Sequence, residues 1–108
     1  MFKFTEELIM SIATTMTREA EKGMKEAVKI MNSYLKKYKS YRISSPQNAP
    51  HCVDGAVECY NMIGLWASKA EQYCTTESER SNLMKITRKD QAEAKSLFSS
   101  FGLSTSSL

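Results

Sequence analysis

The sequence predicts an all-α protein with a long N-terminal helix and two shorter helices, packed as an antiparallel hairpin or bundle. Three observations predict this class. The 108 residues include only four glycines and two prolines, and long windows contain neither. Apolar side chains recur at intervals of three and four residues, the spacing of an amphipathic helix. Alanine, methionine, lysine and glutamate, which favour helices, are abundant. The length fits a single domain, residues 1–108, with a flexible serine-rich tail over residues 102–108.

The first helix should begin near Thr5, a residue type that caps helix N-termini, and should continue to about Ser40. A helix of about 36 residues would be about 54 Å long. Gly23 lies in its middle and has two interpretations. It could kink the helix, because glycine costs about 1 kcal/mol relative to alanine inside a helix. It could instead allow another helix to approach closely, and the sequence leaves both interpretations open.

A linker should run from Ile43 to Pro50, because two prolines with serine and asparagine disfavour a helix and favour turns. The second helix should follow from about Val53 to Cys74. Its apolar seam is rich in small side chains, which allow helix axes to come close.

The third helix should begin after the Thr76-Glu77-Ser78-Glu79 segment, which has the pattern of a capping box, and should reach about Ser99. Residues 87–91 in its middle are all polar. We therefore expect this part to face solvent or the polar surface of a partner. The tail should be mobile unless Phe101 and Leu103 dock against the bundle.

The expected helix lengths predict a homo-oligomer. The second helix, at about 33 Å, and the third, at about 36 Å, cannot each cover a straight first helix of about 54 Å. Either the first helix breaks at Gly23 to give a compact bundle of four segments, or another subunit covers its excess length. The many methionines and alanines on its faces favour the subunit contact.

The three cysteines predict reduced thiols in a cytoplasmic protein. Cys52 and Cys59 are seven residues apart, which on a helix is about 10 Å and too far for a disulfide. His51 could join them as a metal ligand, but there is no Cys-x-x-Cys pattern and no second histidine. We therefore expect no metal site and no cofactor. Because His51 also lacks an evident orienting carboxylate, we expect no enzyme activity.

Membrane association is not expected from the sequence. Glu6 and Glu7 interrupt the first apolar run, so the N-terminal residues do not read as a signal peptide. No window approaches the roughly 18–20 apolar residues that span a bilayer.

The residues from Tyr34 to Arg42 carry four cations and three tyrosines within nine positions. Without these four cations the net charge of +3 becomes −1, so the positive charge of the chain is local. Aromatic faces beside cations can hold nucleobases and phosphates together, by stacking and by charge. The candidate ligand-binding residues are Tyr34, Lys37, Tyr38, Lys39, Tyr41 and Arg42.

A simpler interpretation of this stretch is structural. The tyrosines lie on one helix face and could extend the core, while lysines near a helix C-terminus stabilise the helix dipole. Double-stranded nucleic acid is disfavoured as a partner, because a net charge of +3 with no second basic stripe would neutralise few phosphates.

The string Trp66-Ala67-Ser68-Lys69-Ala70, late in the second predicted helix, resembles the phage anti-CBASS sponge family. The resemblance covers this string and the order of long helix, linker and second helix. It implies a helical hairpin that assembles as a homo-oligomer and sequesters cyclic nucleotide signals without cleaving them. We assign the residues carried over from the family, Trp66, Ala67, Lys69 and Ala70, to packing. The third helix departs from the simple hairpin of that family.

Two functions are therefore expected as alternatives. The first is a non-catalytic binding protein of phage type that sequesters a cyclic or other anionic nucleotide and so blocks host immune signalling. The second is an adaptor or inhibitor that docks a partner protein through a helical face and has no small-molecule ligand.

Overall fold

The computed structural model describes residues 2–108, with side chains described for residues 12–106 and 108. The described residues form helices and no strands, which confirms the all-α class with three main helices. The elements are α1 (Phe2–Ser44), the 3-10 helix η1 (Pro46–Asn48), α2 (Ala49–Glu71), α3 (Glu77–Ser100) and the 3-10 helix η2 (Thr105–Ser107).

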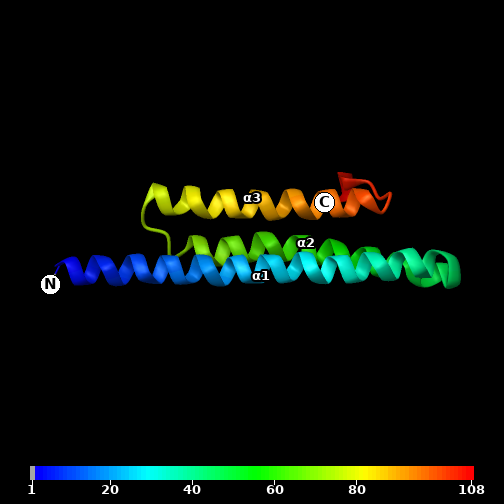
Figure 1. The fold of residues 1–108 in the computed structure, drawn as a ribbon, viewed down its shortest axis with the longest axis horizontal. Helices are drawn as coiled ribbons and strands as arrows, with labels where there is room; N and C mark the ends of the chain where they lie inside the picture. The colour runs from blue at the N-terminus through cyan, green and yellow to red at the C-terminus, as the bar shows by residue number, and fades with distance from the viewer. Residues whose placement is uncertain (1) are drawn as a thin grey trace.

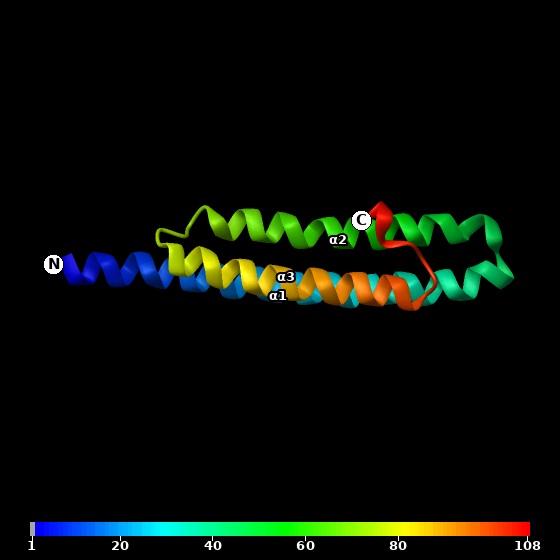
Figure 2. The ribbon, with the colours of Figure 1, turned by 90° about the horizontal axis from the view of Figure 1, so that it is seen from above.

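The three helices lie side by side in a rod with extents of 64 × 18 × 14 Å. After the turn at η1, α2 returns along α1, and α3 then runs in the same sense as α1 (Figure 1). The two views together place α2 and α3 on different sides of α1 (Figure 2). The N-terminal part of α1 extends past both of them.

The core follows the seam where the three helices meet. Small side chains such as Ala20, Ala56 and Ala94 are almost completely buried there, which allows the helix axes to come close. The largest fully buried side chains come from all three helices and are Met24, Met31, Leu35, Ile63 and Phe98.

Two glycines receive aromatic rings across the α1–α2 contact. The indole of Trp66 occupies the space where a Cβ of Gly23 would lie, and a Cβ on Gly55 would be 2.7 Å from the ring of Tyr34. The two contacts are eleven residues apart on each helix, and they follow in opposite order along α1 and α2. Because α1 is continuous through Gly23, the structure favours close approach over a kink.

The helix boundaries differ from those predicted. α1 begins at Phe2, so Thr5 does not cap it, and it continues to Ser44. α2 begins at Ala49 and includes Pro50, because proline is tolerated in the first turn, where its missing N–H has no helical partner. α2 also ends earlier than predicted, at Glu71.

The start of α3 is confirmed as a capping box. The Glu79 N–H donates to Thr76 Oγ1 at 3.1 Å, and the Thr76 N–H donates to Glu79 Oε1 at 3.0 Å. The Thr75 N–H also donates to Glu79 Oε1, at 2.9 Å. This hydrogen bond is the main cause of the lowered pKa of the Glu79 carboxyl.

The expectation that residues 87–91 face solvent or the polar surface of a partner is wrong for Thr87 and Asp90. Thr87 and Asp90 are 5% and 3% exposed and lie in the interior of the bundle. The hydroxyl of Thr87 donates to the Leu83 carbonyl at 2.8 Å within the same helix, so its burial leaves no unpaired donor.

The chain turns back at the end of α3. Gly102 has a φ of 78°, a left-handed conformation that glycine adopts without strain. Phe101, Leu103 and Leu108 are partly buried and pack against the core. The tail thereby lies over the same end of the bundle as the basic stretch (Figure 1).

Candidate ligand-binding site

The end of the bundle near η1 is strongly basic. Between Glu26 and Asp54 the chain has no acidic residue. That segment contains five cations, which are Lys29, Lys36, Lys37, Lys39 and Arg42. Such a concentration of one sign of charge creates a positive potential that attracts small anions.

A hollow of about 330 Å³ lies at this end, between α1 and the C-terminal end of α3. The guanidinium carbon of Arg42 lies 5.9 Å from the centroid of the Tyr38 ring, within the range of a cation–π contact. The hollow is lined by Tyr38, Lys39, Arg42, Ser100 and Phe101. Two cations and two aromatic rings therefore border one open space.

The other three predicted site residues lie elsewhere. Tyr34 packs over Gly55 in the α1–α2 contact, and the Lys37 ammonium lies 6.0 Å from the centroid of its ring. Tyr41 is half-buried and does not line the hollow. The structure thus brings together three of the six predicted residues and adds Ser100 and Phe101, which the sequence analysis missed.

The hollow also has a feature that disfavours an anion. α1 and α3 both end here, and the unpaired carbonyl groups of a helix C-terminus carry a partial negative charge. Lys39 and Arg42 offset this negative charge. Part of their positive charge therefore stabilises the helix ends and does not act on an anion. Ser100 does not help to bind an anion through its hydroxyl hydrogen, because its Oγ donates to the Leu97 carbonyl at 2.6 Å.

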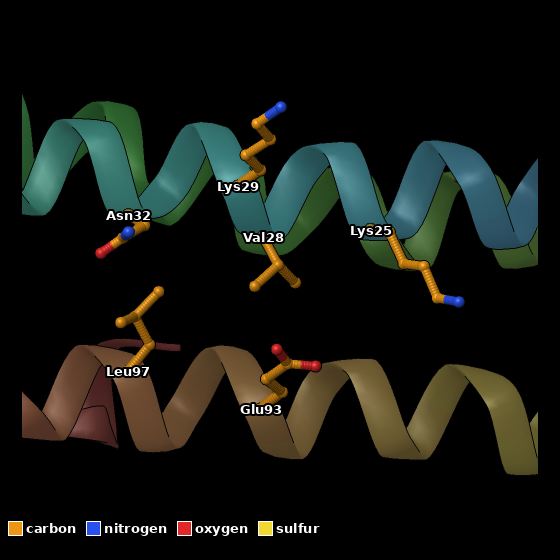
Figure 3. A pocket seen from close by; sticks show the side chains of 6 residues that line it. All are labelled: Lys25, Val28, Lys29, Asn32, Glu93 and Leu97. Carbon is orange, nitrogen blue, oxygen red and sulfur yellow. The ribbon is translucent and has the colours of Figure 1, made fainter.

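A second hollow of about 360 Å³ lies further along the α1–α3 contact, lined by Lys25, Val28, Lys29, Asn32, Glu93 and Leu97. Its charges are mixed. Figure 3 shows the Glu93 carboxylate directed toward α1, while the Lys29 side chain points away from α3. Lys25 pairs with Glu21 at 3.0 Å. This hollow is therefore less suited to an anion than the one at Tyr38.

Asp90 is a buried carboxyl group between α1 and α3. Its Oδ2 has no hydrogen-bond partner. Burial raises the pKa of Asp90, the nearby Glu93 and Glu21 raise it further, and Lys25 and Lys89 oppose the shift.

Asp90→Asn should raise the stability of the protein at neutral pH. Because the pKa of Asp90 is raised in the folded state, the fold favours the protonated carboxyl, and stability falls as the pH rises through that pKa. Removing the buried charge should stabilise by about 1 kcal/mol, or about 4 °C in melting temperature at pH 7. The difference from the parent protein should shrink as the pH approaches 4, the usual range of an aspartate pKa.

Melting curves of the parent and variant between pH 4 and 7 would check this expectation. Asp54→Asn is the matched control, because Asp54 is exposed and its replacement should change little. A lower melting temperature for Asp90→Asn at pH 7 would show that the ionised carboxylate stabilises the contact, through Lys25.

The three cysteines are buried and form no disulfide. Burial is the main cause that raises the pKa of the Cys59 and Cys74 thiols, so these groups have little thiolate character. Within the described part of the chain, no group of three or more His, Cys, Asp or Glu side chains is placed to hold a metal ion. No helix in that part is both long enough and apolar enough to cross a membrane.

Comparison with models of known protein families, with curated proteins and with solved structures found no match for this chain. The function is therefore inferred from the geometry of the hollow at Tyr38.

Proposed function

We propose that the protein is a non-catalytic binding protein that holds a small anionic ligand with an aromatic group, a nucleotide being the class that fits best. The observation that carries the proposal is the hollow at Tyr38, where cations and aromatic rings meet. A base stacked on Tyr38 or Phe101 would place its phosphate within reach of Lys39 and Arg42. Stacking and charged hydrogen bonds are each worth about 1–3 kcal/mol.

The size of the hollow limits the ligand. About 330 Å³ is near the lower end of the range of about 300–1,000 Å³ for small-molecule sites. It would accept the base and one phosphate of a nucleotide, and a larger cyclic nucleotide would extend beyond it. The proposed role is sequestration of such a signal, as in the phage sponge proteins, by a homo-oligomer built on the antiparallel α1–α2 hairpin.

A second candidate function is docking of a partner protein. Ile30, Met62 and Leu65 are between 43% and 55% exposed. Exposed apolar side chains that cluster on one face are typical of protein interaction surfaces.

A screen of nucleotides tests the first function. Cyclic mononucleotides, cyclic dinucleotides and linear nucleotides should be compared with inorganic phosphate by thermal shift, because a ligand of the folded state raises the melting temperature. We expect at least one nucleotide to raise it and phosphate alone to have little effect. If no nucleotide does so, the proposal is wrong and the docking function gains support.

Tyr38→Leu and Arg42→Gln should each weaken binding of that nucleotide about tenfold or more, and added salt should weaken it further. Lys36→Gln is the matched control, because it removes the same charge from the same helix but lies outside the hollow. Titration of labelled nucleotide against each variant gives the comparison. Equal losses for Arg42→Gln and Lys36→Gln would mean that the ligand responds only to the general positive potential.

A further inference from the structure

The side of the α1–α2 pair away from α3 has an uncovered apolar surface. We call it the open face, and it consists of Ile30, Met62, Leu65 and Trp66. Two hollows of about 170 and 180 Å³ flank the Trp66 indole and are lined almost entirely by apolar atoms. None of the residues that line them belongs to α3. Each hollow is large enough to receive an aliphatic side chain from another molecule.

The charges around the open face indicate what covers it. Along α2, Glu58, Met62, Leu65 and Lys69 follow at intervals of four, three and four residues, so they lie on one side of the helix. The order of these intervals is the same when α2 is read from either end, but the acidic and the basic residue exchange places. If two copies of α2 lie together in opposite directions, Glu58 faces the partner's Lys69, and Met62 faces the partner's Leu65.

The first helix repeats this arrangement. Glu19 and Lys37 are eighteen residues apart, which is five helical turns, so they lie on the same line along α1. Reversing α1 about residue 28, the middle of this stretch, again brings an acidic residue opposite a basic one. This point is close to the level of the α2 midpoint, because Gly23 lies beside Trp66 and Tyr34 beside Gly55.

These charged groups are available for such a contact. Within the described side chains, the ion pairs are Lys25–Glu21 and Arg80–Glu77. Among the described side chains, Glu58 and Lys69 therefore have no ion-pair partner, although the Lys69 ammonium lies 5.3 Å from the centroid of the Trp66 ring. If the two copies of α2 ran in the same direction, Glu58 would instead lie level with the partner's Glu58.

We infer that a second copy of this chain covers the open face, running in the opposite direction and related by a two-fold axis. In such an interface one surface patch meets itself, so each opposite-charge contact occurs twice. The pairing specifies the homo-oligomer of the proposed function but does not depend on the nucleotide site, because the residues lining the hollow at Tyr38 are not part of the open face.

The mass of the protein in solution tests the inference. Light scattering coupled to size exclusion should give twice the chain mass of 12.2 kDa. Leu65→Glu should produce a monomer that keeps its helical content, because Leu65 is 55% exposed within one chain. Met84→Glu is the matched control, since Met84 is 50% exposed on α3 and its replacement should leave the dimer intact.

Charge reversal makes the test specific to the opposite orientation. Glu58→Lys and Lys69→Glu should each weaken the dimer about tenfold or more, because two like-charge contacts replace two attractive ones. Combining both changes in one chain should restore it. Mixing the two single variants should give a heterodimer, which a general loss of folding would not produce.

Any of three results would overturn the inference. The first is a monomeric parent protein at all concentrations up to its solubility limit, which would assign the open face to a different partner. The second is a parent dimer that survives Leu65→Glu, and the third is two single charge variants that do not pair when mixed. Nucleotide binding by Leu65→Glu monomers would leave the proposed nucleotide site intact, so the site and the pairing can fail separately.

Discussion

Gly23→Ala should destabilise the protein by about 2 kcal/mol, although alanine favours a helix by about 1 kcal/mol over glycine. The new methyl group would occupy the space filled by the Trp66 indole, so the ring must leave its position between α1 and α2. Part of its buried apolar area would then return to water. A chain of this length should lose about 8 °C in melting temperature.

Gly64→Ala provides the matched control for this result. Gly64 lies within α2, and a Cβ added there would have no atom within 4 Å apart from its chain neighbours and the nearby backbone of its own helix. The same substitution there should stabilise by about 0.5–1 kcal/mol through helix propensity. Calorimetry would give the melting temperatures of both variants. A rise in melting temperature for Gly23→Ala would contradict the close approach of Trp66.

Phe98→Ala should have the largest effect of any single change considered, about 3–5 kcal/mol. Phe98 is 1% exposed and is the largest fully buried side chain, so its removal leaves a cavity where α3 packs on the other two helices. The melting temperature should fall by at least about 12 °C.

Urea unfolding followed by circular dichroism would measure this loss. Met84→Ala, on the same helix but 50% exposed, should change stability by no more than about 0.5 kcal/mol. If the two variants behave alike, α3 does not share the cooperative core described above.

Local signals in the sequence predicted much of the fold. The three main helices follow from the apolar spacing, and the start of α3 from the Thr76–Glu79 capping box, because both signals act within one or two helical turns. The predicted start of α2 is wrong for a related reason. Proline breaks a helix in its interior, yet Pro50 lies in the first turn, where the missing N–H has no effect.

Contacts between helices could not be predicted in the same way. Asp90 has the sequence context of a solvated residue, and only the packing of α3 against α1 buries it. The role of Gly23 depends on Trp66, 43 residues later in the chain.

The candidate site could be predicted only in part, for the same reason. Its basic and aromatic character was visible between Tyr34 and Arg42, but nothing near Phe101 indicates that it would lie beside Tyr38. Conversely, Tyr34 and Tyr38 share a helix side in the sequence pattern, and only the position of Gly55 on α2 assigns Tyr34 to packing.

Ring-proton NMR spectra during nucleotide titration would test the proposed site most directly. Signals of Tyr38 and Phe101 should shift with a common dissociation constant as a nucleotide binds, because stacked bases change the magnetic environment of the rings beside them. The indole of Trp66, which packs against Gly23, fifteen residues before Tyr38 in α1, should not respond. If saturating nucleotide leaves the Tyr38 and Phe101 signals unchanged, or shifts the Trp66 signal instead, the result contradicts binding in the hollow between α1 and α3.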